Sequence, residues 1–145
     1  MCTAKYFAHK NNLKVNIDKR FNERIHGVDC WEDLPKDFEK LQFMDEYYKV
    51  GTGESQKEVL TRMNEALNCL LNEYIGKKII IVSHATAISF LLKMYTDMKC
   101  DGFYYDGQKY FDGCWNFLET FKLVFDENKK LINIKNFNYK DIVKE

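Results

Sequence analysis

Residues 55–76 carry the clearest periodic pattern in the chain, because their apolar positions recur at steps of three and four, as on one face of an α-helix. Ser55 and Glu58, three residues apart, form the capping-box pattern of a helix N-terminus. The segment therefore predicts an amphipathic helix that begins after Ser55 and ends near Gly76. Its apolar positions are Val59, Met63, Ala66, Leu67, Leu70, Leu71 and Tyr74.

A strand followed by a helix is predicted next. Residues 79–82, Ile-Ile-Ile-Val, are apolar at every position, which is typical of a central parallel strand covered on both faces. Residues 85–95, which begin Ala-Thr-Ala-Ile-Ser-Phe, suit a second buried helix. The two segments together predict a parallel strand that leads directly into a helix.

The first third of the chain predicts shorter elements. Residues 3–12 contain helix formers with apolar residues on one side, and residues 13–17, Leu-Lys-Val-Asn-Ile, alternate as in a short strand. A long irregular excursion then covers residues 20–53, with one helical piece at 36–43. Excursions of this length are uncommon unless they serve a function.

The last third predicts a β-hairpin. Residues 114–125 and 130–137 contain alternating stretches around the polar turn Asp-Glu-Asn-Lys-Lys. We therefore expect an α/β fold with an antiparallel addition at its end. No internal repeat or linker-like tract divides the chain, so residues 1–145 are expected to form a single domain.

Composition narrows the function classes. The balance of 22 basic and 22 acidic residues argues against nucleic acid or an anionic membrane as a partner. No apolar run approaches the roughly 20 residues of a membrane span, and the N-terminus lacks a signal-peptide core, so a cytoplasmic location is expected. The five cysteines form no metal-ligand spacing and no even disulfide set, so we expect reduced, mostly buried thiols and no metal.

His84 stands at the seam between the apolar run and the following helix. In open α/β sheets, ligands bind beyond the carboxyl ends of the strands, where the next helix presents unpaired N–H groups. An imidazole at that place can donate a hydrogen bond to a phosphate oxygen or transfer protons near neutral pH. Position alone also fits a structural histidine, so both readings stay open at this point.

Four segments resemble segments of the histidine phosphatase superfamily, the phosphoglycerate mutase-like enzymes, and they occur along the chain in the same order as in that family. Residues 79–92, Ile-Ile-Ile-Val-Ser-His followed by a helical stretch, resemble its strand, Ser-His and helix segment. Residues 18–27 are similar to its Leu-x-Glu-Arg segment, and residues 51–67 to its Gly-Glu-Ser helix with an arginine downstream. Residues 3–8, which begin Thr-Ala, resemble the helix after its second catalytic block.

The resemblance implies a three-layer α/β/α fold with a mostly parallel sheet, and a phosphohistidine mechanism on small phosphate monoesters. It makes Glu23 the proton donor and His84 the second histidine, which holds the phosphoryl oxygens together with arginines. The backbone N–H of Ala85, where many relatives have glycine, is available to the substrate. His26 either lines the pocket or packs nearby. No cofactor or metal is implied.

The departure from the family pattern is the absence of any Arg-His-Gly sequence. Neither His9 nor His26 follows a predicted strand, so neither is expected to replace the nucleophile. We therefore expect an N-terminally truncated member of the fold that lacks the nucleophile. A noncatalytic protein that binds phosphorylated ligands or a partner chain is the alternative, and the residues do not separate mutase from phosphatase.

Two further expectations concern packing. A parallel sheet without its first strand exposes unpaired apolar edges, which predicts a homo-oligomer or strand exchange between chains. Arg62, on the helix that follows Ser55, is expected to pair with Glu58 or with Glu54 rather than with substrate.

Overall fold

The structure is a computed structural model that describes residues 2–138. The chain divides into two compact units, Met1–Leu91 and Leu92–Glu145, and each is described by itself. The expected single domain over residues 1–145 stays a prediction. No helix within the described range is long and apolar enough to cross a bilayer.

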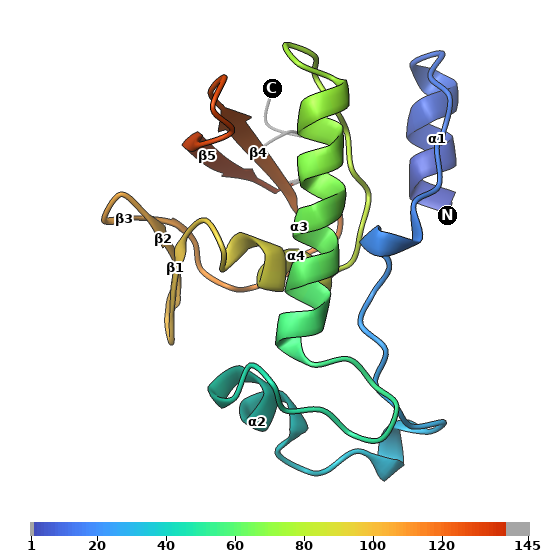
Figure 1. Cartoon of the computed structure of the whole chain (residues 1–145), viewed down its shortest axis with the longest axis vertical. Coiled ribbons are helices and arrows are strands. Elements are labelled where there is room, and N and C mark those ends of the chain that lie inside the picture. Colours follow the sequence, from blue (N-terminus) through green and yellow to red (C-terminus); the bar gives the residue numbers. More distant parts are fainter. Residues whose placement is uncertain (1, 139–145) are drawn as a thin grey trace. The chain divides into compact units, whose positions relative to one another are not determined.

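The first unit is built from helices and extended loops (Figure 1). The long helix α3 was predicted closely, and the helices near the start, in the excursion and after His84 are also confirmed. The helical elements are α1 (Cys2–Lys10), η1 (Lys19–Phe21), η2 (Trp31–Asp33), α2 (Phe38–Met44), α3 (Gln56–Glu73) and α4 (Ala85–Leu92).

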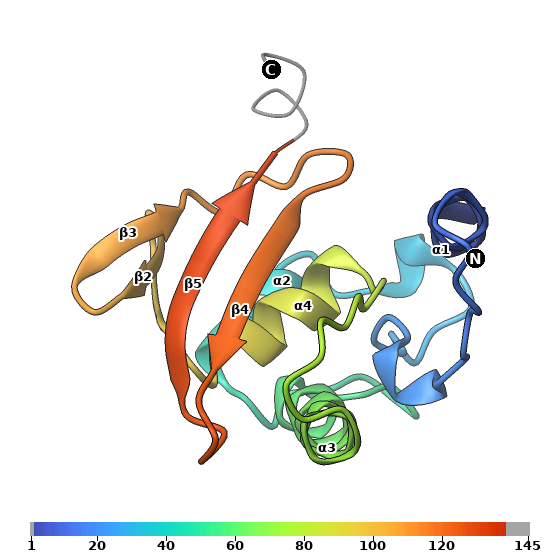
Figure 2. The same cartoon turned by 90° about the horizontal axis from the view of Figure 1, so that it is seen from above.

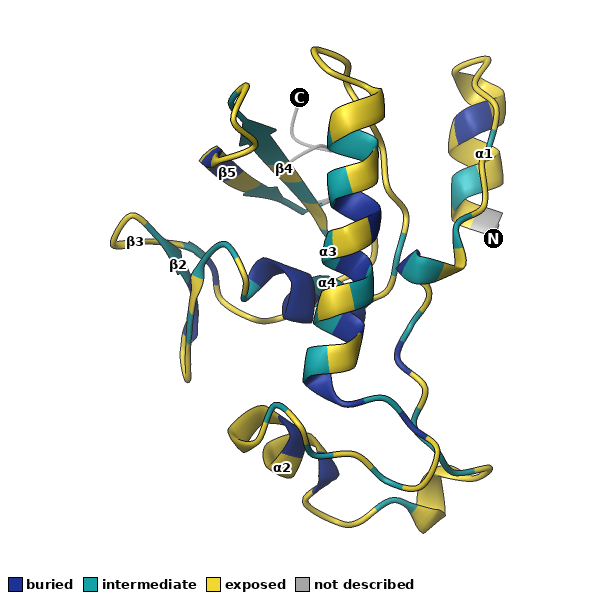
Figure 3. Cartoon of the chain, in the orientation of Figure 1, coloured by how far each residue is buried: buried dark blue, intermediate teal, exposed yellow. Residues whose placement is uncertain are grey.

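Helix α3 begins with the predicted capping box. The Ser55 hydroxyl accepts the Glu58 N–H at 3.2 Å, and the Glu58 carboxylate accepts the Ser55 N–H at 2.8 Å. These reciprocal bonds satisfy two backbone donors that would otherwise be unpaired. One face of the helix is buried, as Figure 3 shows, and its apolar residues are Val59, Met63, Ala66 and Leu67.

Two loops of the first unit approach each other at glycines. Gly27 has φ of +81°, and a Cβ atom there would lie 2.0 Å from the Val50 carbonyl oxygen. Only glycine tolerates both the left-handed conformation and so close a backbone. The Glu54 N–H donates to the Ile25 carbonyl at 2.7 Å, next to this crossing. The crossing therefore fixes the chain just after Glu23 against the start of α3.

The predicted strands at 13–17 and 79–82 are absent from the structure. Neither segment pairs in a sheet, and the side chains of 79–82 are exposed; Ile80 is 58% accessible. The prediction of a central strand buried on both faces is therefore wrong for residues 79–82. The reason is physical: a strand is completed by neighbours, and an apolar run cannot supply its own.

The second unit contains β-strands that pair antiparallel, and the predicted hairpin is confirmed. Strands β4 (Thr120–Phe125) and β5 (Leu131–Phe137) form it (Figure 2). Thr120 lies opposite Phe137. A three-stranded meander of β1 (Asp97–Lys99), β2 (Gly102–Tyr105) and β3 (Gln108–Phe111) was not predicted.

A sequence signal for the meander was present. Asp106 and Gly107 stand between two aromatic stretches, and both have positive φ, of 50° and 75°. An Asp-Gly pair between alternating residues is a strong indication of a tight hairpin turn. Aromatic rings then close the core of this unit, with the Phe111 ring 5.0 Å from that of Phe121 and 5.3 Å from that of Trp115.

The fold class is therefore mixed helix and sheet, consistent with an α/β fold. Every strand pair among residues 2–138 is antiparallel, so the expected mostly parallel sheet of a three-layer fold is not seen there. The expectation of mostly buried thiols is wrong, since Cys30, Cys69, Cys100 and Cys114 are free and exposed.

Candidate functional site

Glu23 is connected to the start of α4 by its side chain. The half-buried Glu23 carboxylate accepts the N–H of Ala87 at 3.1 Å, and the same oxygen accepts the N–H of Arg24 at 2.9 Å. Ala87 is the third residue of α4, so its N–H has no partner inside the helix. The carboxylate therefore caps a helix that lies more than 60 residues further along the chain, where the helix dipole favours negative charge.

His84 stands at the same helix end. Its carbonyl accepts the N–H of Ile88 at 2.9 Å, which makes His84 the residue that precedes the first turn of α4. The side chain is exposed, and its imidazole has no hydrogen bond to any residue that the structure describes. The structure thus brings Glu23, His84 and Ala85 to one helix end, and their expected roles stay predictions.

Backbone donors remain open beside His84. Within the described residues, the N–H groups of Ala85 and Thr86 have no acceptor. The Ser83 hydroxyl, in contrast, already has a partner, since it donates to the Phe21 carbonyl at 2.7 Å. An oxyanion at this end would find two N–H donors and an imidazole, and it would lie near the carboxylate of Glu23.

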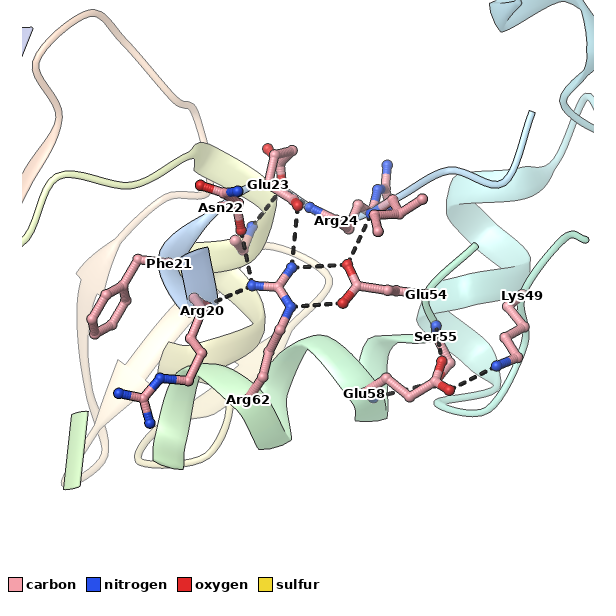
Figure 4. A network of polar contacts seen from close by, with 12 residues as sticks. Arg20, Phe21, Asn22, Glu23, Arg24, Lys49, Glu54, Ser55, Glu58 and Arg62 are labelled. Atoms are coloured by element: carbon pink, nitrogen blue, oxygen red, sulfur yellow. Dashed lines mark hydrogen bonds and ion pairs between the residues drawn. The ribbon is translucent and has the colours of Figure 1, made fainter. Parts of the chain in front are cut away.

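In the first unit, the carboxylate of Glu54 and the guanidinium of Arg62 form an ion pair (Figure 4). Arg62 donates from Nε at 2.7 Å and from Nη2 at 2.8 Å, one bond to each carboxylate oxygen. Burial acts to raise the pKa of Glu54, but the bonds from Arg62 and from the Ile25 N–H outweigh it and lower that pKa. Of the two expected partners, Arg62 therefore takes Glu54, while Glu58 pairs with Lys49 at 2.7 Å.

Arg24 lies in a separate cluster, which also contains the half-buried His26. Arg24 is only 5% exposed, and its guanidinium donates to the Gln42 and Glu39 side chains. Its centre lies 5.0 Å from the Phe38 ring centroid. The Nε group donates to His26 Nε2 at 3.2 Å.

The His26 ring is engaged within this cluster. Its centroid lies 4.5 Å from that of Trp31, and its Nε2 atom is occupied by the bond from Arg24. Burial, followed by the positive charge of Arg24, lowers the pKa of His26. No hydrogen bond joins His26 to Glu23 or to His84 within residues 2–138, so its expected place in the pocket stays a prediction.

The family follows from a comparison with known proteins. The family model of the histidine phosphatase superfamily (branch 1) matches residues 1–121. The chain belongs to this superfamily. No curated protein and no solved structure matches the chain. The resemblance expected from the sequence is thus confirmed, and the matched region contains all the candidate residues.

Two features of this superfamily member were not predicted from the sequence: the burial of Arg24 and a hollow in the second unit. The burial of Arg24 had no signal beyond its place after Glu23, because its partners Glu39 and Gln42 come from α2. An open hollow of about 340 Å³ lies in the second unit and contains none of the candidate residues. Within the described part, no cluster of three or more His, Cys, Asp or Glu side chains could hold a metal ion.

Proposed function

We propose that this superfamily member binds small phosphate monoesters at the N-terminal end of α4. The observation that carries the proposal is the hydrogen bond from the Ala87 N–H to the Glu23 carboxylate, which joins the expected acid to the helix that begins after His84. Open N–H groups at Ala85 and Thr86 suit phosphate oxygens, which are negatively charged acceptors.

Each residue has a distinct task in this proposal. His84 donates a hydrogen bond to a phosphate oxygen and, when protonated, adds positive charge beside it. Glu23 in its protonated form gives its proton to the leaving oxygen as the ester P–O bond breaks. In the mechanism that the superfamily resemblance implies, the phosphoryl group passes to a histidine nitrogen, and water or a bound acceptor then removes it.

Neither of the chain's other histidines is expected to act as the nucleophile, which supports binding of a phosphate ester without its hydrolysis by these residues. The sequence contains no Arg-His-Gly. His9 is exposed near the end of α1, and His26 Nε2 already accepts the Arg24 bond. These observations favour the second candidate function, a noncatalytic phosphate-ligand protein, unless a nucleophile is supplied from elsewhere. The choice between phosphatase and mutase depends on that further step.

Two assays on the purified chain test the proposal. Inorganic phosphate is titrated while the amide resonances of Ala85 and Thr86 are followed by NMR, and hydrolysis of p-nitrophenyl phosphate is measured in parallel. His84→Ala is expected to weaken the phosphate-dependent shifts, whereas the matched control His9→Ala leaves them unchanged.

The outcomes separate the candidates. Binding without hydrolysis supports the noncatalytic role. Hydrolysis that disappears in His84→Ala but persists in His9→Ala shows that a nucleophile operates within these residues and supports the catalytic role. No phosphate-dependent shift of either amide overturns the proposed site.

A further inference from the structure

We infer that Arg62, held by Glu54, is the positioning residue that places the Glu23 carboxylate at the start of α4. This inference rests on the proposed role of Glu23 as the acid. Arg62 lies on α3, 39 residues from Glu23 along the chain, and it acts through the backbone rather than by contact with substrate.

The guanidinium of Arg62 is saturated with acceptors. An arginine side chain carries five N–H donors in a planar fork, and each has a partner here. Two go to the Glu54 carboxylate, and three go to backbone carbonyls (Figure 4): those of Arg20 at 2.6 Å, Asn22 at 3.0 Å and Glu23 at 3.1 Å. The chain on the N-terminal side of Glu23, and Glu23 itself, is thereby fixed to α3.

Glu54 fixes the chain on the other side of Glu23. Its carboxylate accepts the Ile25 N–H at 2.9 Å, and its own N–H donates to the Ile25 carbonyl at 2.7 Å. The side chains of Arg62 and Glu54 are 19% and 18% exposed, so this pair is largely shielded from water. Residues 20–25 are therefore held at both ends by one ion pair whose members belong to α3 and to the residue just before its cap.

This arrangement decides where the Glu23 carboxylate lies. The Glu23 backbone is held at its own carbonyl and on both sides. The side chain therefore loses little further conformational freedom when its carboxylate accepts the Ala87 N–H. Bonds of 2.6–3.1 Å weaken steeply when the atoms move apart by about 1 Å. A loosened backbone would therefore break the contact between Glu23 and α4 before α3 itself is disturbed.

No other residue type reproduces the arrangement. A lysine carries a single ammonium with three donors, and it cannot span two carboxylate oxygens and three separate carbonyls. A glutamine at position 54 loses the charge that attracts Arg62 and offers only one acceptor oxygen. Arg62→Lys and Glu54→Gln should therefore release the same backbone segment by different routes.

The test follows the Ala87 amide proton by NMR as the pH is changed. In the unchanged chain this resonance is expected to depend on pH, because the Ala87 N–H donates to a carboxylate, and Glu23→Gln should abolish that dependence, which assigns it to this contact. Arg62→Lys is expected to remove most of it while far-UV circular dichroism shows that the helices persist. Arg20→Lys is the matched control, since Arg20 belongs to the same segment but its side chain donates to Asp18 and to the Cys69 sulfur, and to no backbone carbonyl.

A merely structural role for Arg62 predicts a different result. If Arg62→Lys lowers the unfolding midpoint but leaves the pH dependence of the Ala87 amide resonance unchanged, the inference is overturned. If Arg62→Lys does not fold, Glu54→Gln provides the same comparison. If the pH dependence of the Ala87 amide resonance is lost in both variants but the unchanged chain does not bind phosphate, the positioning role stands and the proposed function is refuted. If the chain binds phosphate but both variants keep that pH dependence, the positioning role alone is refuted.

Discussion

Replacing Arg24 by methionine should destabilise the first unit by about 3 kcal/mol. Methionine keeps most of the packing against Phe38 and Phe90 but removes every donor of the guanidinium. The Gln42 side chain, whose residue is 0% exposed, loses a charged donor to its oxygen. A buried acceptor left unpaired costs about 1–3 kcal/mol, and a lost cation–π contact adds about 0.5–2 kcal/mol.

Two terms keep the expected loss from being larger. The Glu39 carboxylate is 68% exposed, so its ion pair with Arg24 adds at most about 1 kcal/mol. Methionine also avoids the cost of burying a charge, which offsets part of the loss. The result is still a large fraction of the roughly 5–15 kcal/mol by which a domain is stable.

Urea unfolding monitored by Trp31 fluorescence measures the effect. Trp31 belongs to the first unit, and Trp115→Phe in every variant removes the other tryptophan signal. Arg20→Met is the matched control, because it deletes a half-buried arginine whose partners are Asp18 and the Cys69 sulfur. If Arg24→Met shifts the unfolding free energy no more than Arg20→Met does, the unpaired Gln42 oxygen has found another partner, and the reasoning is refuted.

Other predictions concern the loops, the helix cap, the half-buried His26 and the exposed apolar segment. Gly27→Ala should destabilise the chain by more than 1 kcal/mol in urea unfolding, because the new methyl group meets the facing backbone in a positive-φ conformation; equal stability would contradict the close approach. Ser55→Ala should cost about 1 kcal/mol by removing one capping-box acceptor, and an unchanged unfolding midpoint would mean that another group caps the helix. Since the folded pKa of His26 lies below the unfolded value, its contribution to the unfolding free energy is fully present above about pH 6.5 and is lost as the pH falls through the folded pKa. His26→Gln should flatten that slope in unfolding measured between about pH 7 and pH 5, and a slope unaffected by the change would assign it elsewhere. We also propose that residues 79–82 let two copies associate, since they are apolar, exposed and without backbone partners among the described residues; Ile80→Lys should then halve the mass found by light scattering, and a mass that does not depend on this change would count against it.

Local patterns in the sequence were sufficient for the elements whose forces are local. Helix α3 begins at its predicted cap because Ser55 and Glu58 satisfy each other's backbone within one turn. The hairpin of β4 and β5 forms because a short polar turn brings two alternating stretches together. The family was also readable, because its motifs around Glu23 and His84 are short and contiguous.

Tertiary structure alone decided the features that depend on distant residues. Whether 79–82 becomes a buried strand depends on neighbours that an apolar run does not specify, and the structure leaves it exposed. The choice of Glu54 over Glu58 as the partner of Arg62 depends on where the backbone of residues 20–25 lies. The sequence names the charged groups, but their distances, and so their energies, are set by contacts across 40 residues or more.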